Sequence, residues 1–195
     1  HMLRGRESEL DEQYTGELCK KLGVPLFTCR HDIKKLAEER RISLEEAGRE
    51  ARYRQFDIAA LETGASKIAV AHNKNDQAET VLLNVLRGAG LNGLKGMDYK
   101  SGKIIRPLLD ADRKEIEDYC GRNGLSPRID ASNLESVYTR NKVRLELIPY
   151  INRIFGTDAV KNICRMSLLL SDDNDFIEKA AFSSYERCIA ETGRN

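Results

Sequence analysis

The stretch Ala71-His72-Asn73-Lys74-Asn75-Asp76-Gln77-Ala78-Glu79-Thr80 decides the fold of this chain. A short apolar run, residues 67–71, leads into it, and an amphipathic run, residues 81–86, follows it. This order predicts a strand, a polar loop and a helix. In an open α/β sheet, ligands bind outside the carboxyl ends of the strands, where this loop would lie. We therefore expect the polar side chains of the loop to face a crevice.

Two acidic residues of this stretch are candidates for chemistry. Asp76 and Glu79 are three residues apart, so they share one face of a helix, and we expect both in its first turn, where the helix dipole favours negative charge. Two carboxylates placed there could hold Mg²⁺ through water. The alternative is an ordinary acidic first turn with Asp76 near the N-cap. The motif alone does not decide between these interpretations.

Short apolar runs and amphipathic runs alternate along the chain. Helices are predicted over residues 8–22, 32–40, 43–62, 112–123, 137–148 and 157–195, and further strands over residues 24–29 and 103–109. Such alternation favours a parallel, doubly wound sheet. We therefore predict an α/β fold with a Rossmann-like parallel sheet, followed by a mainly helical C-terminal segment. The sheet is incomplete, because the strand that should precede the first helix is missing.

The division into domains follows from this order of elements. We place a partial nucleotide-binding α/β domain at residues 1–150 and a helical segment at residues 151–195. A capping box at Ser8 is expected to start the first helix, and Pro149 to end the helix before the last one. The last helix carries apolar residues at core-like spacings, and these need a partner surface.

The composition is that of a soluble globular protein, with 41% hydrophobic and 32% charged residues. No run reaches the roughly 18 apolar residues of a membrane span, and no charged-then-apolar leader opens the chain, so we expect a cytoplasmic protein without membrane contact. The cysteines are widely spaced and form no Cys-x-x-Cys pair, which predicts buried free thiols rather than zinc ligands or disulfides. They are Cys19, Cys29, Cys120, Cys164 and Cys188.

Positive charge is concentrated in one part of the chain, although the net charge is only +1. Residues 136–165 hold six Lys or Arg and two acidic residues. Such a segment suggests an anionic partner such as nucleic acid, and a solvated helix face is the alternative. A second weak signal is the set of glycines at positions 88, 90, 93 and 96, whose backbone could approach an anion.

Seven short motifs, in this order, resemble the N-terminal part of the tRNA(Ile)-lysidine synthetases, a family of the PP-loop (N-type) ATP pyrophosphatase superfamily. The resemblance covers residues 1 to about 155. The motifs are Glu45-Glu46-Ala47 with Arg49, Arg52 and Tyr53; Ala71-His72 with Asp76-Gln77-Ala78-Glu79-Thr80; Leu86-Arg87-Gly88; Arg106-Pro107-Leu108-Leu109; Asp130 with Ser132-Asn133; Tyr138-Thr139-Arg140-Asn141 with Arg144; and Ile148-Pro149.

The resemblance implies a reaction and the partners that it needs. ATP, with Mg²⁺, would adenylate the C2 oxygen of a cytidine in the anticodon of tRNA(Ile), and the amine of free lysine would then displace AMP. His72, Asp76 and Glu79 would be catalytic, with the two carboxylates at the metal. The resemblance assigns nucleotide or substrate binding to Arg52, Arg87 and Arg106, and tRNA phosphate binding to Arg140 and Arg144. A homodimer is left open.

One alternative for Arg140 is internal. It would pair with a carboxylate such as Asp130, and Asn133 and Asn141 would complete a buried polar network. Replacing the arginine would then destabilise the fold, because a buried charge would lose its partner.

The chain departs from the family pattern in two places. It has His72-Asn73 where members often have two histidines, and it contains no Ser-Gly-Gly-x-Asp-Ser phosphate loop. We therefore expect an N-terminally truncated fragment that is inactive alone, with His1-Met2 either a tag remnant or native. The alternatives are a catalytically inactive module that binds tRNA or nucleotide and, less favoured without a Cys-x-x-Cys pair, a PP-loop tRNA thiolase relative.

Overall fold

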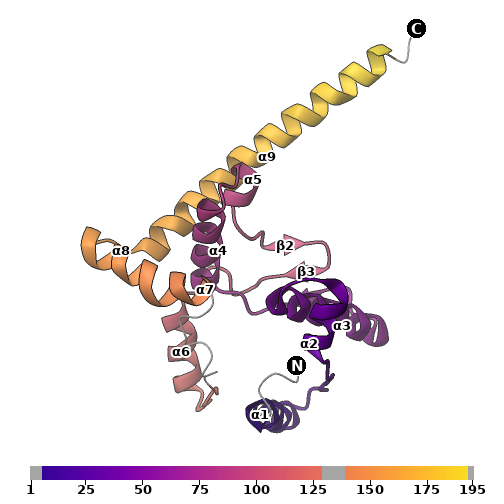
Figure 1. Cartoon of the computed structure of the whole chain (residues 1–195), viewed down its shortest axis with the longest axis vertical. Helices are drawn as coiled ribbons and strands as arrows, with labels where there is room; N and C mark the ends of the chain where they lie inside the picture. The colour runs from indigo at the N-terminus through magenta and orange to yellow at the C-terminus, as the bar shows by residue number, and fades with distance from the viewer. Residues whose placement is uncertain (1–5, 129–138, 193–195) are drawn as a thin grey trace. The chain divides into compact units, whose positions relative to one another are not determined.

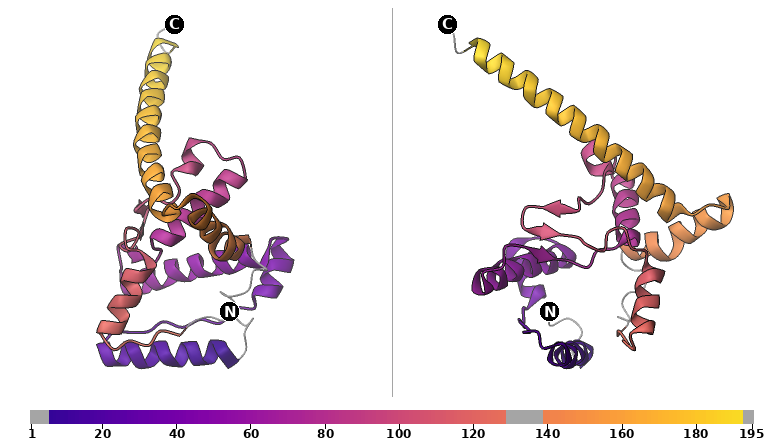
Figure 2. Two further views of the ribbon diagram at one scale, coloured as in Figure 1. Left: turned by 90° about the vertical axis from the view of Figure 1, so that its left-hand side faces the viewer. Right: turned by 180° about the vertical axis from the view of Figure 1, so that it is seen from behind.

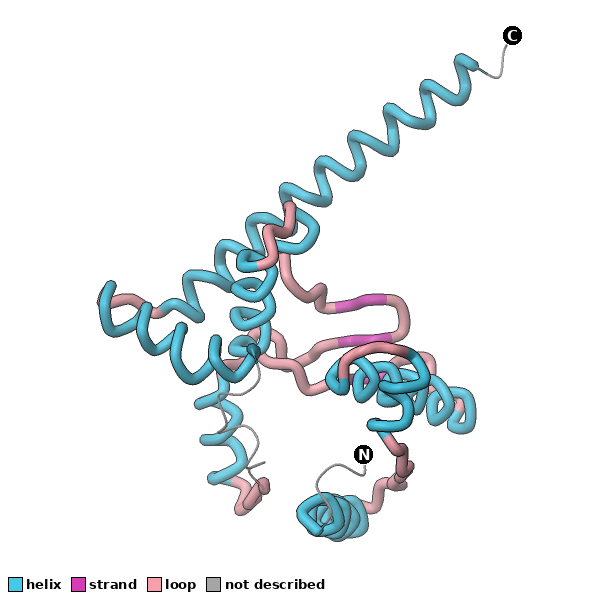
Figure 3. The backbone as a smooth tube through the Cα atoms, viewed as in Figure 1, coloured by secondary structure: helices cyan, strands magenta, loops and turns pink. Residues whose placement is uncertain are grey.

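The computed structural model describes residues 6–128 and 139–192. The chain divides into two compact units, residues 1–68 and 69–195, and each is described by itself. Figure 1 labels the helices and strands along the chain, and Figure 3 shows that helices predominate in both units. The predicted boundary near residue 150 separates an α/β domain from a helical segment and does not correspond to these compact units. It stays a prediction.

The first unit is built from α1 (Arg6–Leu22), α2 (Ile33–Arg40) and α3 (Leu44–Thr63). Side chains cap the second and third helices: Asp32 accepts the N–H of Lys35, and Ser43 accepts the N–H of Glu46. Both predicted helices are therefore confirmed. The core between them joins two buried residues of α2 and two of α3, with Leu36 and Ile42 packed against it: Ile33, Ala37, Ala47 and Ala51.

Two predictions for the first unit are wrong. α1 begins at Arg6, so Ser8 lies inside the helix and does not cap it. Residues 24–29 form no strand, and Val24, Leu26 and Phe27 of this segment are exposed. The physical reason is that a strand needs a neighbour for its backbone hydrogen bonds, and none of the described strands pairs with this segment.

The second unit combines a small sheet with helices. Its elements are β1 (Ile68–Ala69, at the division between the units), α4 (Lys74–Leu86), α5 (Leu91–Leu94), β2 (Lys100–Ser101), β3 (Ile104–Ile105), α6 (Arg113–Arg122), α7 (Thr139–Lys142), the π-helix η2 (Val143–Leu147), α8 (Ile148–Phe155) and α9 (Ala159–Thr192). α9 packs along α4 and α5 and continues beyond them (Figure 2). A buried cluster of Val143, Ile148 and Ala159 joins η2, α8 and α9, with Leu82 and Leu83 of α4 packed against it.

The sheet has the strand order β1-β3-β2. The backbone N–H of Val70, just after β1, donates to the carbonyl of Ile105 at 3.0 Å. β2 and β3 form an antiparallel hairpin in which Lys100 lies opposite Ile105. The α/β class with a helical C-terminal segment is confirmed, but the antiparallel hairpin was not predicted for a sheet expected to be parallel.

The decisive stretch forms the predicted strand, loop and helix, with a shorter loop than expected. α4 begins at Lys74 because Asn73 caps it: the Asn73 side chain accepts the Asp76 N–H at 3.1 Å, and the Asp76 side chain accepts the Asn73 N–H at 3.0 Å. This reciprocal capping box starts the helix seven residues before Val81. Asp76 lies in the first turn as predicted, but Glu79 lies in the second.

The helix expected to end before Pro149 instead continues, because α7, η2 and α8 follow one another without a break to Phe155. Pro149 is the second residue of α8 and follows the five-residue π-helix η2. The π-helical turn of η2 changes the backbone hydrogen-bond register just before Pro149, so the run accommodates a residue without a backbone N–H. The helix then ends at Gly156, whose φ is 59°.

The cysteines and the last helix are more exposed than predicted. Cys29 and Cys188 are exposed and the other three thiols are half-buried, so the prediction of buried thiols is wrong. Burial raises the pKa of Cys164 to about 11. α9 buries Ser167 and Asn174, whereas Phe176 and Phe182 are exposed.

Among residues 6–128 and 139–192, every helix is too short or too polar to span a bilayer.

The side chain of Gln77 forms hydrogen bonds that hold α4 against residues 95–97 and against α9. Its Nε2 lies 3.1 Å from the carbonyl of Lys95 and 3.0 Å from Oγ of Ser167, and its Oε1 accepts the N–H of Met97 at 2.7 Å. Gly96 lies directly against this amide with a φ of 71°, and a Cβ there would come within 2.7 Å of Nε2. The close approach of these two segments therefore depends on the glycine.

We expect Gly96→Ala to destabilise the protein more than Gly88→Ala. Both glycines have positive φ, but a Cβ at Gly88 would meet nothing within 4 Å. Both variants lose about 1–2 kcal/mol to the left-handed backbone, and Gly96→Ala loses a further ~1–3 kcal/mol to overpacking. Urea denaturation of the two variants measures the difference. Equal losses would contradict the tight contact at Gly96.

Candidate functional site: a carboxylate–arginine cluster

Four charged side chains meet where α4 contacts the helical run of α7 and η2. Glu79 is at the centre and accepts hydrogen bonds from two guanidiniums. Its Oε2 lies 2.7 Å from Nε of Arg140, and its Oε1 lies 2.6 Å from Nε of Arg144. A second nitrogen of Arg144, Nη2, lies 3.0 Å from Oε2. Arg144 therefore binds Glu79 through two nitrogens, which is the strong, directional form of this ion pair.

Asp76 completes the cluster one turn before Glu79. Its Oδ1 accepts from Nη2 of Arg140 at 3.1 Å and from Nη2 of Arg144 at 3.4 Å. Its Oδ2 accepts the backbone N–H of Asn73 at 3.0 Å. The same carboxylate thus starts α4 and orients both arginines. We call Asp76, Glu79, Arg140 and Arg144 the carboxylate–arginine cluster.

Helix periodicity explains why these four side chains converge. Asp76 and Glu79 are three residues apart on α4, and Arg140 and Arg144 are four apart on the opposing helical run, so each pair shares a face. The Glu79 side chain is fully buried, whereas Asp76, Arg144 and Arg140 are 18%, 24% and 31% exposed. The cluster is therefore closed around Glu79 and open to solvent on the side of the other three.

The charges of the cluster cancel. Hydrogen bonding to Glu79 raises the pKa of Arg144 above its ordinary value, although burial acts in the opposite direction, so this guanidinium stays charged. A carboxylate removed from water is stable only when it is paired and hydrogen-bonded, and Glu79 meets both conditions. The cluster thus holds α4 against α7 and η2.

Sequence reasoning assigned Arg140 and Arg144 to tRNA phosphates, with internal pairing of Arg140 as the alternative. Both guanidiniums are paired within the chain, with Asp76 and Glu79 rather than with Asp130. Asp130 and Asn133 lie outside the described residues, and Asn141 is buried. Contact between these arginines and tRNA stays a prediction.

The predicted Mg²⁺ site does not fit the cluster in this arrangement. Each of the four oxygens of Asp76 and Glu79 accepts a hydrogen bond, and the two guanidiniums offset both negative charges. Within the described part of the chain, no three His, Cys, Asp or Glu side chains are placed to hold a metal ion. A magnesium ion on these carboxylates stays a prediction that requires the arginines to move.

The remaining predicted site residues do not join the cluster. His72 is half-buried and directly precedes the N-cap of α4, whereas Arg87 is exposed at the opposite end of that helix. Arg106 is buried, with Nη1 2.6 Å from the carbonyl of Asp98 and no hydrogen bond from its Nε to the described residues. Arg52 is exposed on α3, in the first unit. Their assignments to nucleotide or substrate stay predictions.

Sequence reasoning missed two residues that shape the site. Asn73 caps α4, and its spacing to Asp76 was a readable signal of a capping box. Gln77 fixes the opposite side of α4 through four hydrogen bonds. No local sequence pattern predicts this role, because the partners of Gln77 are backbone groups and a serine 90 residues away.

Comparison with known proteins gives consistent results. Residues 1–151 match the PP-loop domain family. The chain is 48% identical over 178 residues to the tRNA(Ile)-lysidine synthase of Caldanaerobacter subterraneus subsp. tengcongensis, covering 91% of the chain and 38% of that protein. It is 46% identical over 186 residues to the tRNA(Ile)-lysidine synthase of Clostridioides difficile, covering 95% of the chain and 40% of that protein. The chain thus spans about 40% of the length of these relatives.

A solved structure shares the fold. The U34-tRNA thiolase NcsA from Methanococcus maripaludis, determined with its [4Fe-4S] cluster, superposes with a TM-score of 0.64. The superposition covers 87% of this chain and 59% of that one, at 15% sequence identity. A likeness at this level of identity shows the fold alone.

Removing the central carboxylate should destabilise the protein strongly. In Glu79→Gln, two partly buried guanidiniums lose their common anion, and we expect the free energy of unfolding to fall by about 3–5 kcal/mol. The matched control is Glu117→Gln, which breaks an exposed pair with Arg113 on α6 and should cost at most about 1 kcal/mol. Denaturant titration of both variants gives the comparison, and a similarly small loss in each would refute the structural role of Glu79.

Proposed function

Because this chain belongs to the PP-loop domain family, we propose that it is part of an enzyme that ligates lysine to the anticodon cytidine of tRNA(Ile). ATP would adenylate the C2 oxygen of the cytidine and release pyrophosphate, and the amine of free lysine would then bond to C2 and displace AMP. The observation that carries the proposal is the 46–48% identity to proteins named tRNA(Ile)-lysidine synthase over 91–95% of the chain. The reaction and its substrates are proposed for the whole protein.

The carboxylate–arginine cluster gives this proposal two oriented guanidiniums. Arg140 and Arg144 are held in fixed orientations yet remain partly exposed. Guanidiniums held in this way could stabilise negative charge that develops on a transferring phosphoryl group, without reorganising at the moment of reaction. ATP, when bound, supplies the adenylyl group, and no step proposed here depends on Mg²⁺ at these carboxylates.

The burial of the cluster separates the roles of its carboxylates. Glu79 is fully buried, so it would act by positioning the two arginines. Asp76 is partly exposed and His72 precedes it by four residues, so these two are proposed to act at the ligand itself. Asp76 would orient a polar group of the ligand through the remaining lone pair of its Oδ2.

A second candidate function is a tRNA- or nucleotide-binding module without catalysis. The 195 residues contain no Ser-Gly-Gly-x-Asp-Ser phosphate loop, which the first candidate requires of the whole protein. Both candidates agree that this chain alone is inactive, because the remaining groups would hold only one side of a triphosphate. They differ in what the protein does at its natural length.

The test is lysine-dependent AMP formation by the protein at its natural length, with ATP and a tRNA(Ile) transcript. We expect Asp76→Asn to lower the rate by about 10² or more, because the group acts on charge in the transition state. The melting temperature should change little, since Glu79 still pairs with both arginines. Asp118→Asn, an exposed acid of α6, is the matched control and should retain the parent rate.

The outcomes separate the candidates. No lysine-dependent AMP from the parent protein would leave the binding module as the function. A normal rate in Asp76→Asn would remove that carboxylate from the catalytic groups. The same assay on the 195-residue chain alone should give no AMP above background.

A further inference from the structure

Three cations at the start of α4 and α9 have no acidic partner among the described residues. Lys74 is the first residue of α4, and Lys161 and Arg165 lie in the first two turns of α9. No carboxylate of the described residues forms an ion pair with any of the three, whereas Arg140 and Arg144 are fully engaged with theirs. Lys161 and Arg165 are exposed and four residues apart, so they project from one face of α9.

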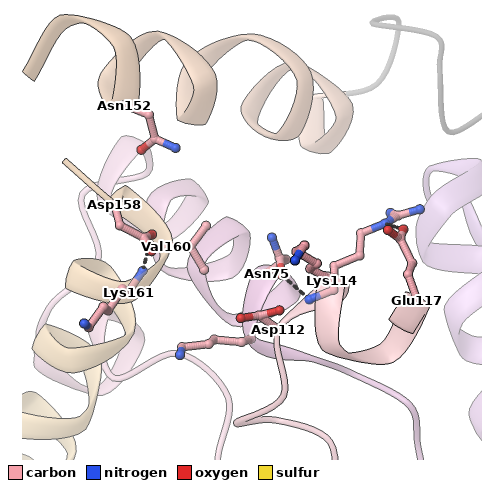
Figure 4. A pocket seen from close by; sticks show the side chains of 10 residues that line it. Asn75, Asp112, Lys114, Glu117, Asn152, Asp158, Val160 and Lys161 are labelled. Atoms are coloured by element: carbon pink, nitrogen blue, oxygen red, sulfur yellow. Dashed lines mark hydrogen bonds and ion pairs between the residues drawn. The ribbon is translucent and has the colours of Figure 1, made fainter. Parts of the chain in front are cut away.

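Two adjoining pockets bring the three cations onto one surface. A pocket of about 450 Å³ is lined by Lys74, Lys114 and Lys161, and Figure 4 shows Lys114 and Lys161 on different sides of it. A second pocket of about 280 Å³ is lined by Lys74, Lys161 and Arg165. The two lysines therefore stand on the ridge that both pockets share. We call Lys74, Lys161 and Arg165 the cationic ridge.

The acids around the first pocket are already engaged. Asp112 caps α6, and Asp158 accepts the backbone N–H of Lys161 at 3.0 Å (Figure 4). Each of these carboxylates faces the N-terminal N–H groups of a helix, which offset its charge. Glu117 pairs with Arg113 at 2.8 Å. None of these acids neutralises the ridge.

The acidic side chains that line the second pocket also have partners within the chain. Asp98 pairs with Lys95 at 3.2 Å, and Asp110 accepts the hydroxyl of Tyr99 at 2.6 Å. This hydrogen bond raises the pKa of Tyr99 to about 12, so the phenol stays neutral and adds no negative charge. The ridge thus keeps its positive charge between two pockets whose acids are used internally.

We propose that the cationic ridge contacts the phosphate backbone of tRNA. The three cations are spread over two pockets instead of converging in one enclosed site, which suits an extended polyanion better than a small ligand. Two of its members belong to the basic segment identified in the sequence, in which Arg140 and Arg144 already pair with Asp76 and Glu79. The inference rests on the proposed function, which supplies tRNA as the partner.

The salt dependence of tRNA binding tests the ridge in the protein at its natural length. The variant Lys74→Gln/Lys161→Gln/Arg165→Gln removes three cations and keeps polar side chains in their place. We expect weaker binding and a slope of log K against log[salt] that is shallower by about 0.7–0.9 for each lost contact, or about 2 or more for all three. Phosphate contacts carry no sequence information, so tRNA(Ile) and an unrelated tRNA should show the same change in slope.

The matched control is Lys179→Gln, which removes an exposed cation farther along α9. It should leave the slope unchanged, and all variants should keep the parent urea midpoint. An unchanged slope in the triple variant overturns the inference. A slope that falls as much in Lys179→Gln as it does for each charge removed in the triple variant also overturns it. So does a parent protein that does not bind tRNA.

The two proposals fail separately. A shallower slope without lysine-dependent AMP formation refutes the proposed reaction and keeps the ridge. Lysine-dependent AMP formation with an unchanged slope supports the proposed reaction and refutes the tRNA contact of the cationic ridge.

Discussion

The second unit depends on one buried charge, the carboxylate of Glu79. A carboxylate without access to water must be paired and hydrogen-bonded, and within the described part of the chain the guanidiniums of Arg140 and Arg144 are the two that reach Glu79. Because Arg140 and Arg144 come from α7 and η2, satisfying Glu79 fixes those elements against α4. The apolar cluster of η2, α8 and α9 then packs on the same helix. Electrostatic and apolar contacts therefore specify the same arrangement.

The pairing of Glu79 also positions the residues proposed to act on the ligand. The arginines that neutralise Glu79 retain partly exposed edges beside Asp76, so one set of interactions both stabilises the helices and offers oriented positive charge. The opposite side of α4 is held by Gln77, which bonds the segment at Lys95 to Met97 and Ser167 of α9. α4 is thus fixed on both faces. A helix held in this way can position charged groups precisely.

Local signals in the sequence predicted much of this fold. Helices were predicted to begin at residues 32, 43 and 112, and in the structure Asp32, Ser43 and Asp112 are the N-caps of three helices. The strand, loop and helix around Asp76 were also predicted, because each follows from patterns within a few residues. The spacing of Asp76 and Glu79 correctly indicated that they share one face of a helix.

The remaining features depend on distant contacts that local patterns do not contain. The partnership between Glu79 and Arg144 joins residues 65 apart in sequence. Residues 24–29 have strand propensity but no paired neighbour among the described strands. The helix passes Pro149 because η2 changes the hydrogen-bond register before it. Pairing, partner choice and register are tertiary properties, so sequence reasoning identified the charged residues without finding which of them pair.

A double-mutant cycle between Glu79 and Arg144 tests the central claim most directly. The free energy of unfolding would be measured for the parent, Glu79→Gln, Arg144→Gln and the double variant. If the buried pair holds η2 against α4, the two losses are strongly non-additive, with a coupling energy of about 2–3 kcal/mol. A coupling energy below about 0.5 kcal/mol, the value expected of independent sites, would contradict the account.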